Sequence, residues 1–402
     1  MKKLILIIAL VSNIFAEELI SNESSDLEND FFQSIDFEND FFIEESDEDN
    51  NFDFNNEFFK ESISFTGDFK FDSSYSDYDV KESTIDSSIE SNINLDIRLK
   101  EGVKAYTSIN LFKTNDDTTN IDFIKINEMF FDFNIDNKIY VRGGKQNLAW
   151  GRGYYFNPTD LINIEKKKLD DVTAQREGNL GLKIHIPSGI EKNFYAYVQL
   201  EDTILVEDSS LALKYEFLFK NSKFSIATIL RNSQKYDQLI ALDFASSLGK
   251  FQTFGEFLIR EGDELKVNND IVLQGTLGYS RDFDRKPKEE DKIITLIQEF
   301  YYNGAGFKNK EDHPLYNTYS DAKYYLATFI TANKFYHKDL NLSFNILSNL
   351  NENIHQLNFN LTYKLNQEVN IKPYFTTYLG EQGNLEGFLP KYLFGLSADI
   401  RF

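Results

Sequence analysis

From residue 60 onward, apolar and polar side chains alternate along the chain in runs of about ten residues. Clear examples are Ile93 to Leu99, Leu180 to Ile186, Leu340 to Ile346 and Leu357 to Leu365. Such alternation is typical of a β-strand that crosses a membrane, with one face toward lipid and the other toward a polar lumen. The alternative is a large soluble sandwich or β-helix, whose strands would be shorter, about five or six residues.

The alternating runs can be counted, and the count defines the predicted fold. We predict an all-β chain: a transmembrane antiparallel up-and-down β-barrel of about 18 strands, with a count of 16 left open. The predicted strands are 60–71, 91–99, 103–113, 124–134, 138–146, 178–186, 193–201, 210–219, 222–232, 236–246, 249–260, 271–280, 293–302, 323–333, 339–348, 355–365, 369–379 and 391–402.

The lengths of the connections indicate how the barrel is oriented. If the chain starts in the periplasm, every second connection should be a short periplasmic turn and the others should be longer. Longer connections are predicted at 72–90, 147–177, 261–270, 303–322 and 380–390. The long connection 281–292 and the short connection 233–235 depart from this rule.

The residues before the barrel form two different segments. Residues 1–16 read as a signal peptide, with Lys2 and Lys3 before the apolar run Leu4 to Phe15. A membrane anchor is the alternative, but it needs about twenty residues. Residues 17–59 are acidic and repeat Glu-Asn-Asp-Phe-Phe at 28–32 and 38–42. We interpret them as a disordered periplasmic tail or as a plug whose phenylalanines dock into a groove. The barrel domain is then 60–402.

Composition removes several classes of function. The net charge of −23 argues against a nucleic-acid partner. The absence of Cys excludes disulfides and thiolate metal sites. The four His stand in no zinc spacing such as HExxH, so we expect neither a metal nor a cofactor, and no enzyme. A hydrolase at the barrel rim, using His185 with Ser188 or His313 with Asp312, is the enzymatic alternative.

The last strand carries the most specific signal in the chain. Its apolar face includes Tyr392, Phe394 and Ile400 and ends on the final residue, Phe402. This resembles the C-terminal strand of bacterial outer-membrane barrels, which the barrel-assembly machinery reads. The resemblance implies the outer membrane of a diderm bacterium, with its lipid and that machinery as partners. The alternative is an edge strand of a soluble sheet.

The longest connection, 147–177, contains Trp150-Gly151-Arg152 and Asn157-Pro158-Thr159-Asp160. This stretch, from Arg142 to Arg176, resembles the WGR…NPTD segment of poorly characterised porin-like families, for which alginate-export barrels are an analogy. Asn157 and Pro158 are turn residues, and Asp160 could cap a helical turn. Because Arg152, Lys166, Lys167, Lys168 and Arg176 make the connection basic, it could form a constriction inside the lumen or pack on the rim.

Strand phase selects the charged side chains that should face the lumen, because charge on the lipid face costs about 2–4 kcal/mol. They are Asp96, Arg98, Arg142, Lys183, Lys214, Glu216, Lys364, Asp399 and Arg401. An 18-stranded barrel is too wide for side chains to fill, so it needs water or a plug. We therefore predict a porin-like channel for small hydrophilic solutes. The alternatives are a surface-exposed binding or assembly barrel with a plugged lumen, and an export channel for a charged polysaccharide. By analogy with trimeric porins, the protein could form a homo-oligomer.

Overall fold

The computed structural model describes residues 62–79, 81–99, 102–115, 124–160, 162, 176–189, 191–200, 209–231, 239–263, 266–284, 293–307, 321–380 and 389–402. The predicted signal peptide 1–16 and the acidic segment 17–59 lie outside these residues. Within the described ranges, no helix has the length and apolar character needed to cross a membrane.

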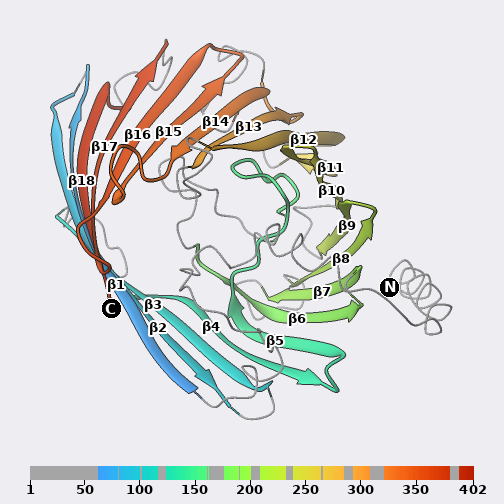
Figure 1. Cartoon of the computed structure of the whole chain (residues 1–402). Coiled ribbons are helices and arrows are strands. Elements are labelled where there is room, and N and C mark those ends of the chain that lie inside the picture. The colour runs from blue at the N-terminus through green and yellow to red at the C-terminus, as the bar shows by residue number, and fades with distance from the viewer. Residues whose placement is uncertain are drawn as a thin grey trace. The chain divides into compact units, whose positions relative to one another are not determined.

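The described residues form one antiparallel sheet of 18 strands that closes on itself (Figure 1). Each strand pairs with its neighbours in sequence, and β1 also pairs with β18, which closes the barrel. The predicted all-β barrel and its count of eighteen are confirmed. The strands are β1 (Ser62–Asp77), β2 (Thr84–Arg98), β3 (Lys104–Thr114), β4 (Ile124–Ile135), β5 (Ile139–Gln146), β6 (Asn179–Ser188), β7 (Lys192–Leu200), β8 (Ser209–Phe219), β9 (Ser222–Arg231), β10 (Leu239–Leu248), β11 (Phe251–Asp263), β12 (Lys266–Asp284), β13 (Ile293–Asn303), β14 (Tyr324–Ala332), β15 (Leu340–Asn349), β16 (Ile354–Lys364), β17 (Val369–Leu379) and β18 (Tyr392–Arg401).

Two predicted connections are wrong because the strands run further than their apolar alternation. β1 extends to Asp77 and β2 starts at Thr84, so the predicted connection 72–90 shrinks to 78–83. In the same way β11 and β12 leave only 264–265 of the predicted connection 261–270. The extensions are rich in polar residues, and the pairs Ser73-Ser74 and Ser87-Ser88 interrupt their period-2 signal.

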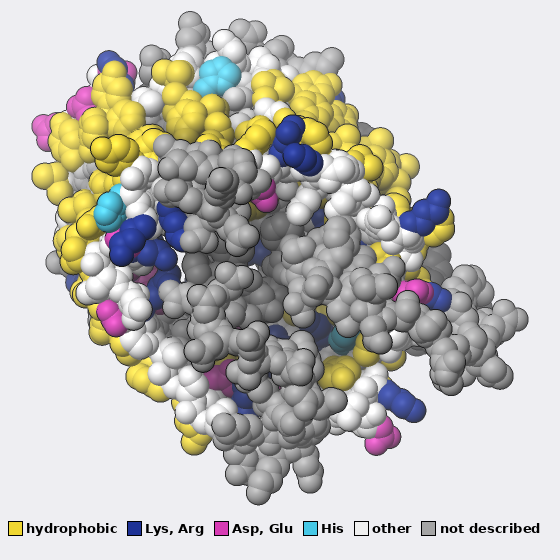
Figure 2. All heavy atoms as spheres, in the orientation of Figure 1, with side chains coloured by type: hydrophobic (Ala, Val, Ile, Leu, Met, Phe, Trp, Pro, Cys, Tyr) yellow, Lys and Arg dark blue, Asp and Glu magenta, His cyan; other side chains and the backbone are white. Residues whose placement is uncertain are grey.

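Large apolar side chains cover the outside of the barrel, and the space-filling view shows them along much of its outer edge (Figure 2). Phe131, Leu277 and Phe394 are each about half exposed or more. A soluble monomer rarely exposes apolar surface on this scale, whereas the lipid-facing wall of a barrel does so in every strand.

The seam of the barrel is closed by the last residue. The backbone N–H of Phe402 donates to Gly67 O, and the N–H of Gly67 donates to Phe402 O, each at 2.9 Å. The Phe402 ring lies 5.5 Å from the ring of Phe69 and 6.2 Å from that of Phe65. A Cβ on Gly67 would stand 2.5 Å from the Phe402 ring, so a glycine is needed at this position. Phe402, the last residue of the predicted assembly signal, is thus also a seam contact.

Candidate functional site: a segment inside the barrel

After β5 the chain turns into the space enclosed by the strands (Figure 1). We call residues 147–160 the inner segment. Its two glycines are required by close approach. Gly151 has φ 105°, and a Cβ there would lie 2.6 Å from the Glu256 carboxylate. A Cβ on Gly153 would lie 2.0 Å from the carbonyl oxygen of Phe156. In this motif Gly151 therefore allows a close approach to the barrel wall, and Gly153 allows a close approach to Phe156 within the segment.

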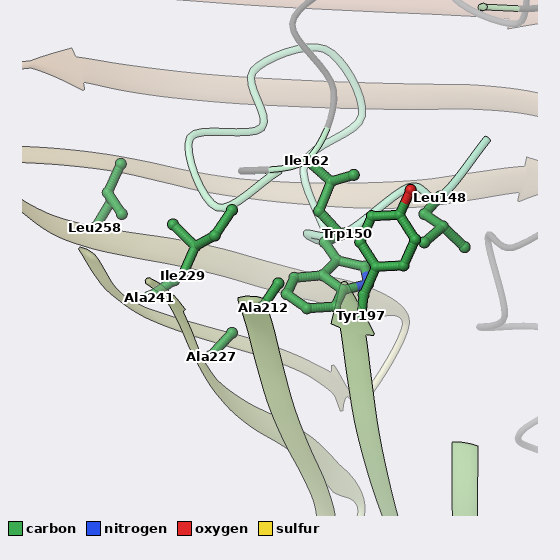
Figure 3. Packing of buried hydrophobic residues seen from close by; sticks show 9 residues of the cluster. All are labelled: Leu148, Trp150, Ile162, Tyr197, Ala212, Ala227, Ile229, Ala241 and Leu258. Carbon is green, nitrogen blue, oxygen red and sulfur yellow. The ribbon is translucent and has the colours of Figure 1, made fainter. Parts of the chain in front are cut away.

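The first anchor of the inner segment is Trp150, the only Trp in the chain. Its indole lies among Ala212, Ile229 and Tyr197 on the inner faces of β7, β8 and β9 (Figure 3). Ala212 and Ile229 are completely buried, and Trp150 is almost so. Small residues on the wall leave a recess that the indole fills, and burying so large a ring contributes about 2–3 kcal/mol.

The second apolar anchor is the run Tyr154-Tyr155-Phe156, which contacts the inner faces of β13 and β14. The Phe156 ring stacks on Tyr301 at a centroid distance of 4.6 Å and an angle of 15°. The Tyr154 ring meets Phe329 edge-on at 4.8 Å. The two anchors therefore attach the inner segment to different parts of the wall.

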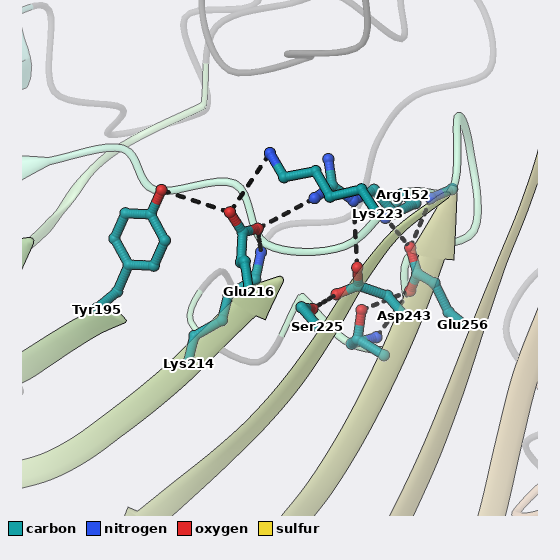
Figure 4. A network of polar contacts seen from close by, with 10 residues as sticks. Arg152, Tyr195, Lys214, Glu216, Lys223, Ser225, Asp243 and Glu256 are labelled. Atoms are coloured by element: carbon teal, nitrogen blue, oxygen red, sulfur yellow. Dashed lines mark hydrogen bonds and ion pairs between the residues drawn. The ribbon is translucent and has the colours of Figure 1, made fainter. Parts of the chain in front are cut away.

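Arg152 lies between the two apolar anchors and is buried. Its guanidinium donates to Glu216 of β8 from Nη2 at 3.0 Å and to Asp243 of β10 from Nε at 3.1 Å (Figure 4). Lys214 and Lys223 also contact Glu216, at 2.8 and 3.4 Å. One guanidinium thus bridges two strands, which its planar fork of donors suits and a lysine could not match.

Two further carboxylates hold the backbone of the inner segment. Glu256 of β11 accepts the backbone N–H of Arg152 and Gly153, and it accepts both the N–H and the hydroxyl of Thr159, at 2.9 and 2.8 Å. Glu299 of β13 accepts the consecutive N–H groups of residues 154–156, at 2.9 Å for Tyr155 and 3.1 Å for Phe156. Converging backbone N–H groups form an anion-binding concavity, here occupied by the carboxylates of the wall.

The end of the inner segment is a turn. The N–H of Asp160 donates to Asn157 O at 3.2 Å, so Asn157 and Pro158 serve as the predicted turn residues. The helical turn that Asp160 could cap would follow it, and residues 161 and 163–175 lie outside the described ones, so that cap stays a prediction. The Asp160 carboxylate accepts hydrogen bonds from the N–H of Trp150 at 3.2 Å and from Arg176 Nη1 at 3.0 Å, which ties the two ends of the segment together.

Glu177, just before β6, fixes the return of the chain to the wall. Its carboxylate contacts Lys145 of β5 and lies 2.5 Å from Lys125 of β4. Partial burial opposes ionisation, but hydrogen bonds and charge from the two lysines outweigh it and lower the pKa of Glu177 below its ordinary value. The carboxylate therefore stays ionised at neutral pH, and this tie weakens only as the pH falls through that lowered pKa.

Comparison with known proteins finds similar barrels among solved structures. No family model and no curated protein matches the chain. A mutant form of the porin of Rhodopseudomonas blastica is 10% identical, with a TM-score of 0.47, over 85% of this chain and 100% of that one. OccAB3 of Acinetobacter baumannii is 10% identical, with a TM-score of 0.54, over 85% of this chain and 99% of that one. The chain shares the barrel fold of OccAB3. The predicted barrel architecture is thereby confirmed at the level of the fold.

The structure places the predicted pore-lining residues of this barrel in two groups. Lys214 and Glu216 are buried beneath Arg152, between the wall and the inner segment. The others lie on strands away from these contacts: Asp96, Arg98, Arg142, Lys183, Lys364, Asp399 and Arg401. Among them Arg142 pairs with Asp132 of β4, and Asp399 pairs with Lys372 of β17. Lys166, Lys167 and Lys168 lie outside the described residues. For the charged residues on the strands, a pore-lining role stays a prediction. For the three lysines, a place in the basic connection that could form a constriction stays a prediction.

The inner wall of β15–β18 and β1–β3 has a different character, because polar side chains dominate it. Thr376 donates to Asn358 at 2.7 Å, Tyr374 donates to Asp72 at 2.9 Å and Asn110 donates to Asn92 at 2.9 Å. These are hydrogen-bonding groups that suit a hydrated surface. Among the described residues, no cluster of three or more His, Asp or Glu is placed to hold a metal ion.

Sequence reasoning missed Asp243, Glu256 and Glu299. A signal was present for the two glutamates. Each stands at an inward position between apolar inward neighbours, Phe254 and Leu258 for Glu256, and Ile297 and Tyr301 for Glu299. A carboxylate in such a setting needs partners, because burying an unpaired charge is costly.

Proposed function

We propose that this protein is an outer-membrane channel through which small hydrophilic solutes pass, and that the inner segment forms its constriction. The observation that carries the proposal is the position of the inner segment. It is attached to Asp243, Glu256 and Glu299, which lie in the middle of their strands, so it narrows the lumen at mid-height and not at the rim.

The outer surface and the terminal strand support the membrane location. The exposed apolar side chains on the wall suit contact with lipid, and Tyr392, Phe394 and Phe402 lie among them on the outside. The polar wall opposite the inner segment suits passage of water and hydrophilic solutes. The arrangement favours a channel over an enzyme.

The proposal is tested by ionic current. The purified, folded full-length protein is inserted into a planar lipid bilayer in potassium chloride, and single-channel currents are recorded. We expect stepwise, long-lived conductance increments. A folded protein that inserts and gives no current would refute the channel and favour the alternative of a binding barrel with a closed lumen.

A further inference from the structure

A cavity of about 380 Å³ lies on the inner wall at the end of the barrel that carries the short turns. Its charged lining residues are Arg98 of β2, Lys104 of β3, Asp132 of β4, Arg142 of β5 and Lys183 of β6, joined by His185 of β6. These side chains come from five consecutive strands and from both sides of two turns. The volume falls in the range of cavities that hold small organic ligands, about 300–1,000 Å³.

The charge of this cavity is opposite to that of the chain. The protein carries a net charge of −23, yet four cationic side chains converge here. Two carboxylates face them: Asp132, which pairs with Arg142, and Asp96, which lies 3.2 Å from Lys104 and 3.5 Å from Arg98. Glu128 of β4 adds a third negative charge that interacts with Arg142 and Lys104. The four cationic side chains still outnumber these carboxylates, so the cavity attracts an anion.

The cationic groups are held in place before any ligand arrives. Asp132 accepts Arg142 Nε at 2.7 Å and Nη2 at 2.8 Å, and the guanidinium lies 3.9 Å from the centroid of the Phe130 ring. A guanidinium carries five N–H donors, and Asp132 engages those of two of its three nitrogens. A group fixed in this way loses little entropy on binding a second carboxylate.

Two rings, those of Tyr140 and His185, also line the cavity. The His185 ring stacks on Tyr195 at 4.4 Å and 11°, and Tyr140 lies against it at 5.8 Å. The hydrogen bond between His185 Nε2 and Asn193, 2.9 Å long, fixes the ring in that position. Lys183 lies 5.7 Å from the centroid of the Tyr195 ring. Cationic groups and ring faces thus border one space.

We propose that this cavity is a binding site for flat organic carboxylates, which engage the cationic side chains with the carboxylate and the aromatic groups with the ring. This proposal rests on the proposed channel function, because it names the class of solute that the channel would bind at this end of the barrel. The binding itself does not require current.

The test measures binding and current separately on the full-length protein in detergent and in bilayers. Isothermal titration calorimetry with benzoate should show saturable binding, whereas benzyl alcohol, which has the ring without the charge, should bind far more weakly. K183Q should weaken benzoate binding about tenfold, the effect of losing one charge-assisted contact. K364Q removes the same charge from β16 outside the cavity lining, and it should leave benzoate binding within about twofold of the parent.

The outcomes separate the two proposals. Absence of benzoate binding, or equal weakening by K183Q and K364Q, would overturn the carboxylate site, even if the protein conducts. Benzoate binding that K183Q weakens and K364Q leaves unchanged would support the site, even if no current flows and the channel proposal fails. Heat-modifiable migration on gels establishes that each variant is folded. A second variant, K104Q, repeats the test from β3 if K183Q does not fold.

Discussion

Two glutamates from distant strands hold the inner segment by its backbone. Glu256 and Glu299 are about 100 and 145 residues from the N–H groups that they accept. Since the donors are backbone groups, these hydrogen bonds do not depend on which side chains residues 154–156 carry. The glycines at 151 and 153 matter more, because any side chain there would collide with a carboxylate or a carbonyl oxygen. At the residue scale, the carboxylate oxygens determine where the backbone of the inner segment lies.

The first prediction concerns Glu299. In the Glu299→Gln variant one carboxylate oxygen becomes an NH2 group, which would face the N–H groups of Tyr155 and Phe156 and cannot accept from them. Leaving buried donors unsatisfied costs about 1–3 kcal/mol each. We therefore expect the inner segment to detach locally, giving a larger and noisier single-channel conductance. The control is Glu191→Gln in the exposed turn before β7. Identical currents in both variants would show that Glu299 does not position the constriction.

The second prediction separates charge from geometry at Arg152. If Arg152 acted only as a lumen charge, the Arg152→Lys variant would conduct like the parent protein. The structure instead has Arg152 bridging Glu216 and Asp243, which one ammonium group cannot do with the same geometry. We expect Arg152→Lys and Arg152→Ala to alter conductance in the same direction. Breaking a buried pair costs about 3–5 kcal/mol, so both should also lower the denaturation midpoint. Parent-like conductance in Arg152→Lys would return Arg152 to the role of a simple charge.

At the scale of elements, the strands could be predicted from sequence and the partners of the inner segment could not. Each strand makes its own period-2 pattern, so β16 is visible in residues 355–365 without its neighbours. In the ends of β1 and β2, pairs of serines interrupt this pattern. The inner segment was visible as a motif through Trp150 and Pro158. Its attachment to Glu256 and Glu299 depends on how a closed barrel brings distant strands around it, and no local pattern encodes that.

The third prediction concerns the seam between β1 and β18. A methyl group at Gly67 would meet the Phe402 ring at 2.5 Å and Asn92 O at 2.7 Å. Gly275 of β12 is the matched control, because its nearest neighbour to such a methyl group is Glu256 O at 3.1 Å. We expect Gly67→Ala to lower the temperature at which the barrel unfolds on heat-modifiability gels, and Gly275→Ala to lower it less. The reverse order would mean that the Phe402 ring does not secure the seam.

At the scale of the whole molecule, the barrel is lined asymmetrically. The inner segment, with its apolar and acidic contacts, lies against β7–β14, and the polar side chains line β15–β18 and β1–β3. The barrel closes through β1 and β18, on the side away from the inner segment. The barrel closure and the attachment of the inner segment therefore use different strands, and one can be altered while the other is kept.

The fourth prediction uses that separation. Replacing residues 151–158 by a short glycine–serine linker removes Arg152, the apolar anchor Tyr154-Tyr155-Phe156 and most of the donors to Glu256 and Glu299. Because the β1–β18 seam is untouched, the variant should still migrate as a heat-modifiable barrel. Glu256→Gln and Glu299→Gln are added to the same variant so that no unpaired carboxylate is left on the wall. If the inner segment is the narrowest part of the lumen, single-channel conductance should rise by about twofold or more. A folded barrel with unchanged conductance would place the narrowest point elsewhere and would leave the inner segment as a brace for the wall of β8–β14.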